Sequence, residues 1–208
     1  MTAAQADRAC AGRSVAAVVF VVSVTLAGFA ADLLTKSLAF RYVADHPVVL
    51  SRNAGGHEAV LPDHRPIVVV PKVLALKLTT NTGAVFGLGR GSQWLFIAAS
   101  VVAVVALGQL FYVGPPGAFG RHLAIGLILA GALGNLYDRL MFKAVRDLFW
   151  LFPGVRLPFG LTWPGGASDL YPWLFNLADA ALLVGVVMLV VILWRDDTPR
   201  RTCRSDHD

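Results

Sequence analysis

The sequence predicts a membrane α-helical protein: a four-transmembrane-helix bundle with a small extracytoplasmic β-sheet domain after the first helix. Hydrophobic residues make up 56% of the 208-residue chain and charged residues only 15%, whereas a soluble domain of this length carries more charge. The mean hydropathy is +0.64. Four apolar stretches also reach the length of about 20 residues that a helix needs to cross a bilayer. They run roughly over residues 14–34, 92–113, 122–141 and 175–194.

The first span is preceded by Arg8 and Arg13 and followed directly by Asp32 and Lys36. Basic residues, an apolar run and small residues in this order also resemble a secretory signal peptide. The run is long for the hydrophobic part of such a peptide, so a retained span is the preferred interpretation and cleavage is the alternative.

The segment between the first two spans, 35–91, is long enough to fold on its own. Ile67–Val70 and Val73–Thr79 are rich in β-branched residues and alternating leucines, which is the periodicity of strands. They predict a small sheet lying on the membrane surface. The middle of the segment, 52–66, contains Gly, Pro and His and reads as a flexible insertion.

The third and fourth spans are separated by an outer loop, 142–174. Residues 149–173 hold four prolines and several aromatic residues. Proline excludes a regular helix, and Trp and Tyr favour the membrane–water interface. An interfacial loop is therefore preferred over a dedicated substrate lid. The second and third spans are joined by a short turn, 114–117, of glycines and prolines.

The net charge of +5 would suggest nucleic acid as a partner of a soluble protein, but here the basic residues follow a membrane topology and no nucleic acid is expected. They precede the first span, lie between the second and third, and follow the fourth: Arg8, Arg13, Arg121, Arg195, Arg200, Arg201 and Arg204. The positive-inside rule then places both tails, 1–13 and 195–208, in the cytoplasm and the membrane domain, 14–194, between them. Lys72, Lys77 and Arg90 oppose this orientation.

Polar residues of all four spans gather at the outer end of the bundle, which predicts a cavity open to that side. They are Asp32, Lys36, Asn81, Asn135, Asp138, Arg139, Asp147, Asn176 and Asp179. An ionisable residue within a span is by default a functional candidate. Asp179 lies about one turn inside an apolar helix, and Asp147 approaches from the outer loop. Two such carboxylates can share one proton and activate a water.

Most of these polar residues also have a structural interpretation. Asp32 and Lys36, four residues apart on one helix face, form either an ion pair that anchors a helix end or part of a binding site. Asp138 beside Arg139 is interpreted as a brace, with Arg139 available to a lipid headgroup or a substrate carbonyl. Asn135 and Asn176 are candidates for hydrogen bonds between helices.

Other chemistries find little support in the sequence. It contains no His-Glu-x-x-His zinc motif, no Gly-x-Ser-x-Gly elbow and no phosphate-binding loop, so neither a metal nor a cofactor is expected. Cys10 and Cys203 lie in the tails and receive no role. A non-enzymatic membrane carrier or scaffold with buried carboxylates remains the alternative, although it predicts polar residues through the whole membrane depth. A presenilin-type protease requires a Gly-x-Gly-Asp motif, which is absent.

Five motifs, in order along the chain, resemble those of bacterial lipoprotein signal peptidase, also called signal peptidase II. They are Asp32-Leu-Leu-Thr-Lys36, Asn81-Thr-Gly83-Ala-Val-Phe86, Gly131-Ala-Leu-Gly-Asn135-Leu-Tyr-Asp138-Arg139, Val145-Arg-Asp147 and Phe175-Asn176-Leu-Ala-Asp179. The resemblance implies an aspartyl protease of the bacterial cytoplasmic (inner) membrane, without metal or cofactor and with its active site near the outer face. Its substrates would be lipid-modified prolipoproteins, cut on the amino side of the lipidated cysteine, and globomycin-type inhibitors are expected to block it.

By the same resemblance, the catalytic pair falls on Asp147 and Asp179. Substrate-binding roles fall on Asn81, Asn135, Arg139 and Asn176. Supporting roles fall on Asp32, Lys36, Asp138, Gly83 and Phe86. The chain departs from the family in two places: Leu148 replaces a usual Phe, and the stretch between the two aspartates is longer than usual.

Overall fold

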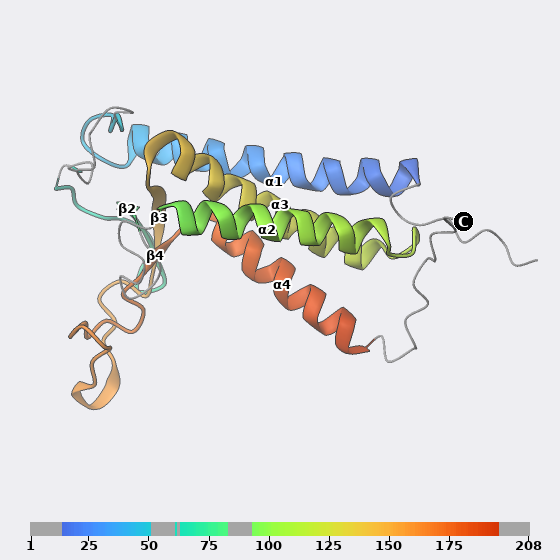
Figure 1. The fold of residues 1–208 in the computed structure, drawn as a ribbon. Coiled ribbons are helices and arrows are strands. Elements are labelled where there is room, and N and C mark those ends of the chain that lie inside the picture. Colours follow the sequence, from blue (N-terminus) through green and yellow to red (C-terminus); the bar gives the residue numbers. More distant parts are fainter. Residues whose placement is uncertain (1–13, 51–60, 62, 83–92, 196–208) are drawn as a thin grey trace, which may run out of the picture.

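The structure is a computed structural model that describes residues 14–50, 61, 63–82 and 93–195 of the chain. It confirms the predicted fold class, because four helices carry a small antiparallel sheet at one end of their bundle (Figure 1). Gly83, Phe86, Cys10, Cys203, both tails except Arg195, and most of the predicted insertion 52–66 lie outside the described residues. The helices are α1 (Val15–Tyr42), α2 (Gln93–Tyr112), α3 (Phe119–Phe142) and α4 (Leu177–Arg195).

All four helices are long and apolar enough to cross a membrane, and α3 is the one around which the others pack. Its glycines permit this close approach, as small residues do between transmembrane helices. A Cβ at Gly126 would lie 2.7 Å from Val24 of α1, and one at Gly131 would collide with the carbonyl oxygen of Ala178 in α4. The third span is thus a central helix, with a polar end that the other helices cover.

Helix α1 continues to Tyr42, well past the predicted end at residue 34. Ala39 and Phe40, in its last turns, join a buried cluster with Leu78 and Leu148 of the sheet. The helix therefore extends beyond the membrane-spanning length because the sheet covers its final turns. Asp32 and Lys36 consequently lie within the helix and not at its end.

The sheet has four strands in the order β1-β2-β3-β4, each antiparallel to its neighbour. The predicted hairpin is present as β1 (Ile67–Val70) and β2 (Leu74–Asn81). The other half comes from the segment predicted as an outer loop, in which β3 (Val145–Leu151) and β4 (Leu174–Phe175) lie. Asp147 is therefore a strand residue, and the prediction that it lies in an outer loop is wrong.

Between β3 and β4 the chain forms a projecting arm, Phe152–Trp173, that extends sideways from the sheet across the direction of α1 (Figure 1). Its two limbs are joined by backbone hydrogen bonds from Leu157 to Ser168 (2.8 Å) and from Leu170 to Val155 (2.7 Å). The arm contains one 3-10 turn, Pro158–Gly160, and no α-helix, as its prolines require.

Candidate active site

Strand β3 carries Asp147 into the interior at the junction of sheet and bundle. In its register with β2, Asp147 faces Thr79 and Val145 faces Asn81. Alternate side chains share one face of a sheet, so Asn81 and Asp147 are diagonal neighbours on the same face. Asp147 is only 2% exposed. Leu148, the departure from the family pattern, points to the other face and packs in the cluster around Phe40.

The start of α4 holds Asp179 through reciprocal helix capping. The backbone N–H of Asp179 donates to Oδ1 of Asn176 (3.0 Å), and the N–H of Asn176 donates to Oδ2 of Asp179 (3.2 Å). This is the geometry of a capping box, which satisfies otherwise unpaired N–H groups at a helix start. Asn176 therefore precedes α4 as its cap and does not lie inside the helix, as the predicted span 175–194 implied.

Two asparagine amides connect the carboxylates of Asp147 and Asp179. Nδ2 of Asn176 donates to Oδ1 of Asp147 (2.7 Å) and to Oδ1 of Asn135 (3.2 Å). Nδ2 of Asn135 in turn donates to Oδ1 of Asp179 (2.7 Å). The structure thus brings these four predicted site residues into one hydrogen-bonded group, to which β3, α3 and the start of α4 contribute.

The environment of Asp147 favours its protonated form. Burial raises the pKa of this carboxyl, and the nearby charge of Asp179 raises it further. Hydrogen bonds from the Asn176 and Asn81 side chains and the charge of Lys36 act in the opposite direction, and the resulting pKa is about 7. A carboxyl with this pKa can both hold and release a proton at neutral pH, which is what general acid–base catalysis requires.

This raised pKa predicts a pH-dependent stability difference between the wild type and Asp147→Asn. From about pH 4 to pH 7 the folded protein keeps a proton that the unfolded chain has released, so stability falls as the pH rises. Each unit between the ordinary pKa of 3.8 and about 7 corresponds to about 1.4 kcal/mol, so the penalty above pH 7 is at most about 4 kcal/mol.

Asn carries no charge, and the variant avoids this penalty. The melting temperature of Asp147→Asn relative to the wild type is therefore expected to rise between pH 4 and pH 8 in detergent. Asp63→Asn, an exposed site, serves as the control. A melting-temperature difference for Asp147→Asn that stays constant with pH would contradict the raised pKa.

A buried ionic network lies directly behind the amides. The ammonium of Lys36, which is 0% exposed, lies 2.7 Å from Oδ2 of Asp32 and 3.2 Å from Oδ2 of Asp138. It also donates to Oδ1 of Asn135 (3.2 Å). Oδ1 of Asp32 accepts from the backbone N–H of Ala178 in the first turn of α4 (2.9 Å). Lys36 and Asp32 therefore connect the α1 interior to the residues that hold Asp179.

Asp138 was interpreted as a brace without a named partner, and the structure pairs it with Arg146. It accepts two hydrogen bonds from the guanidinium of Arg146 (2.8 and 3.1 Å) and one from the backbone N–H of Arg146 (3.0 Å). Arg139, its neighbour in sequence, instead places its guanidinium 4.9 Å from the ring centre of Phe96. Adjacent residues in a helix point about 100° apart, so the side chains of Asp138 and Arg139 meet different neighbours.

Arg146 and Tyr171 are site-region residues that sequence reasoning did not single out. Arg146 is 7% exposed. A basic residue next to Asp147 in an otherwise apolar stretch was the sequence signal that could have identified it. Tyr171 lies in the arm, where its ring contacts those of Trp173 and Phe175 at centroid distances of 5.4 and 6.4 Å. Burial raises the pKa of Tyr171, and the charges of Asp179 and Asp147 raise it further, which places this phenol near the two carboxylates.

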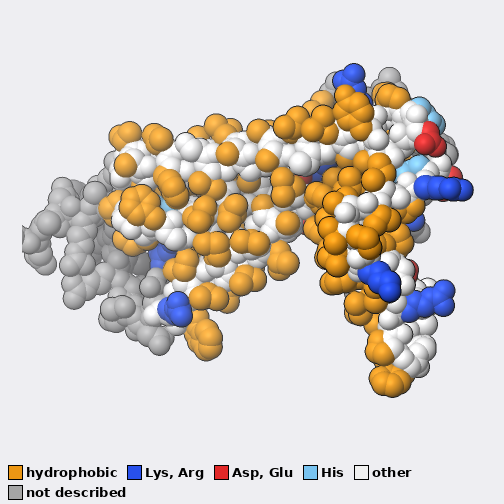
Figure 2. Space-filling model, turned by 180° about the vertical axis from the view of Figure 1, so that it is seen from behind, with side chains coloured by type: hydrophobic (Ala, Val, Ile, Leu, Met, Phe, Trp, Pro, Cys, Tyr) orange, Lys and Arg blue, Asp and Glu red, His pale blue; other side chains and the backbone are white. Residues whose placement is uncertain are grey.

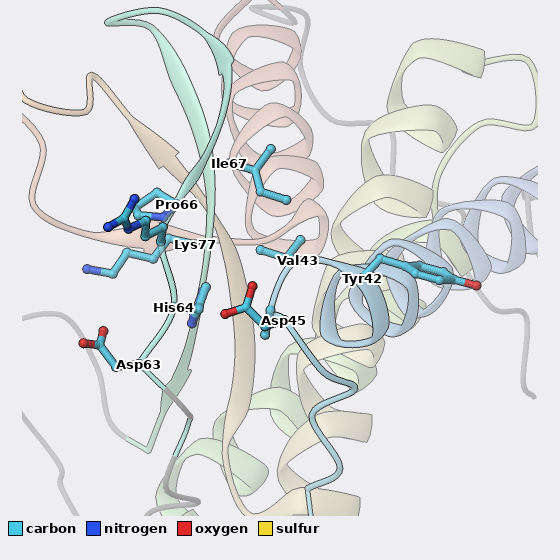
Figure 3. A pocket seen from close by; sticks show the side chains of 10 residues that line it. Tyr42, Val43, Asp45, Asp63, His64, Pro66, Ile67 and Lys77 are labelled. Atoms are coloured by element: carbon cyan, nitrogen blue, oxygen red, sulfur yellow. The ribbon is translucent and has the colours of Figure 1, made fainter.

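A separate polar pocket lies beside the sheet, lined in part by Asp45, Asp63, His64 and Lys77 (Figure 3). None of the predicted site residues lines it. Nε2 of His64 accepts from the backbone N–H of Leu78 (2.9 Å), so this imidazole is fastened to β2. Across the part of the chain that the structure describes, no group of His, Cys, Asp and Glu side chains is arranged to hold a metal ion.

Comparisons with known proteins agree with the resemblance of the motifs. The family described as Signal peptidase (SPase) II matches residues 24–195. The lipoprotein signal peptidase of Desulfitobacterium hafniense is 33% identical over 135 residues, which are 65% of this chain and 78% of that protein. The lipoprotein signal peptidase of Rhodopirellula baltica is 34% identical over 176 residues, which are 80% of this chain and 67% of that protein.

The fold is also found among solved structures. A bacterial membrane enzyme determined by the in meso method at 2.3 Å resolution superposes with a TM-score of 0.60 and 22% identity. The match covers 90% of this chain and 94% of that one. At this identity the comparison establishes the shared fold.

Proposed function

Since the chain belongs to the signal peptidase II family of aspartic peptidases, we propose that it removes signal peptides from diacylglyceryl-modified prolipoproteins. Its four apolar helices are those of a multi-pass membrane protein. The cut would fall on the amino side of the lipidated cysteine. One observation carries the proposal: Asp147 and Asp179 are joined through two asparagine amides at one end of an apolar bundle. The lipoprotein signal peptidases among its relatives support the substrate class.

In the proposed mechanism, Asp147 and Asp179 share one proton. The ionised carboxylate takes a proton from water, and the resulting hydroxide attacks the scissile carbonyl carbon. The protonated carboxyl polarises the carbonyl oxygen, and a proton then passes to the leaving amine as the C–N bond breaks. These steps use only water and the two side chains, and they return the pair to its starting state.

The proposed roles of the other polar residues follow from their contacts. Asn135 and Asn176 use their amides to hold the two carboxylates, so we assign them to positioning the pair as well as to substrate contact. Asn81 lies beside Asp147 on the same face of the sheet. Arg139 has a guanidinium at the sheet end of α3 and is assigned to a substrate carbonyl or a lipid headgroup.

The orientation in the membrane follows from the basic residues. Arg121 lies near the start of α3 and Arg195 at the end of α4, and both positions are opposite to the sheet (Figure 1). By the positive-inside rule, this end and both tails would face the cytoplasm, and the carboxylates would lie at the outer face. A lipid-anchored substrate would enter laterally from the bilayer, where burial of its acyl chains supplies affinity.

The proposed activity is tested with the purified full-length chain and a diacylglyceryl-modified prolipoprotein. The expected product begins with the lipidated cysteine, and globomycin is expected to block its formation. The same precursor without the lipid serves as the matched control and should remain uncut. If no modified precursor is cleaved under any condition, the proposal fails and the carrier alternative is favoured.

A further inference from the structure

We propose that the projecting arm, Phe152–Trp173, docks on the surface of the lipid bilayer and inserts Phe159 and Leu161 at the boundary between headgroups and acyl chains. This docking surface is independent of the cleavage chemistry. It gives the long stretch between the two aspartates a partner of stated chemistry, a phospholipid surface.

The tip of the arm, residues 158–161, carries hydrophobic side chains that the protein itself does not cover. Phe159 is 98% exposed and Leu161 is 58% exposed. The backbone of Phe159 has a φ of 58°, in the left-handed region that glycine and asparagine adopt more readily. The ring of Phe159 therefore makes almost no contact with the rest of the protein, although its backbone conformation is an unfavourable one for a large side chain. Its presence indicates a hydrophobic partner outside the chain.

The arm lies at the depth where the bilayer surface is expected. Helix α4 has 19 residues and is therefore about 28 Å long, close to the roughly 30 Å of a hydrocarbon core. Its first residue follows β4 almost directly, and the arm ends where β4 begins. Because the arm extends across the direction of the helices (Figure 1), it runs along the membrane surface and not away from it.

The hydrophobic surface is also continuous from the bundle to the arm. Trp94 and Leu95, at the sheet end of α2, are 78% and 63% exposed on a helix that is long and apolar enough to cross a membrane. Figure 2 shows hydrophobic side chains passing from the helices onto the base of the arm and gathering again at its tip. The hydrophobic surface of the bundle therefore extends onto the arm (Figure 2).

Contacts within the arm hold its tip in a fixed position relative to the sheet. Rings of Trp163 and Trp173 pack at a centroid distance of 4.8 Å, and Nε1 of Trp163 donates to the carbonyl of Asp169 (3.0 Å). Tryptophan and tyrosine prefer the membrane interface. Tyr171 and Trp173 lie between the tip and β4, so a docked tip would also fix the chain that leads to Asn176.

The docking is tested in the full-length protein reconstituted in phosphatidylcholine–phosphatidylglycerol vesicles. A single cysteine replaces Phe159 or, in a second variant, Leu161, with Cys10 and Cys203 changed to serine, and carries an environment-sensitive nitrobenzoxadiazole label. Nitroxide lipids labelled at the top of the acyl chains should quench roughly half or more of the emission at both positions, because interfacial side chains reach about 5–10 Å into this boundary.

The matched control is Asp63→Cys, an exposed position beside the polar pocket (Figure 3), where the label should remain unquenched. The proposal is overturned if the labels at 159 and 161 behave like the label at 63. It is also overturned if they report an apolar environment without quenching by lipid, because a second copy of the chain then covers the tip. Neither readout depends on peptide cleavage, so failure of the docking and failure of the proposed activity are separable.

Discussion

Replacing Asp179 by asparagine is expected to lower kcat by about 10³-fold or more, since one member of the proposed acid–base pair is lost and such pairs act as a unit. Asparagine keeps the size of the side chain and one oxygen that can accept from Nδ2 of Asn135 or from the N–H of Asn176. The helix start should therefore form. Initial rates of prolipoprotein cleavage measure the effect, and the melting temperature in detergent verifies the fold.

Asp147→Asn is expected to produce a loss of similar size, and the double variant should be no worse than either single one. This non-additivity distinguishes a catalytic pair from two independent contributors. Asp63→Asn is the control for removing a carboxylate, because Asp63 lies in the polar pocket away from the pair. Full activity in either single variant would exclude the dyad mechanism.

The helical part of the fold could be predicted because its cause is local. A span needs length and apolar composition, and both are visible in the sequence. The hairpin β1–β2 was predicted from its alternation and β-branched residues. Strand β3 was not, because residues 145–148 are buried on both faces and such a strand shows no alternation. Its pairing with β2 is a tertiary contact between segments separated by a helix pair.

For the candidate site, the sequence indicated which residues take part but not which partners they meet. Charges in apolar spans are costly, and this pointed to Asp179 and to the polar end of α3. The partners of these charges were not predictable. From the sequence, Asp138 could pair with Arg139, its neighbour, or with Arg146. The chain turn after α3 brings Arg146 to Asp138, and this turn was not visible in the sequence. Likewise, the capping role of Asn176 depends on where α4 begins.

Lys36 is expected to be the residue whose loss destabilises the fold most. Its ammonium is the shared partner of Asp32 and Asp138, which are 1% and 0% exposed. Lys36→Met keeps much of the side-chain volume but leaves both carboxylates without this cation. Removing one partner of a buried ion pair costs roughly 3–5 kcal/mol. The free energy of unfolding, measured by SDS titration in mixed micelles, should fall by about this amount.

Asp32→Asn in the Lys36→Met background tests the cause of that loss. Asparagine at 32 can still accept from the N–H of Ala178. It removes the carboxylate that Lys36→Met leaves without a cation, whereas Asp138 keeps Arg146, so part of the stability should return. Lys72→Met, in the exposed turn between β1 and β2, is the control for losing a lysine and should change little. Unchanged stability in Lys36→Met would show that the network contributes nothing to the fold.

A readout of activity separates the two consequences of losing Lys36. The same ammonium holds Oδ1 of Asn135, whose Nδ2 meets Asp179. Without Lys36, Oδ1 of Asn135 keeps only the hydrogen bond from Nδ2 of Asn176. The amide is then held less firmly, so kcat should fall even at temperatures where Lys36→Met is fully folded. KM should change less, because Lys36 is 0% exposed and has no surface that a substrate could contact. Wild-type kcat in folded Lys36→Met would confine this lysine to stability and leave the capping of α4 to position Asp179.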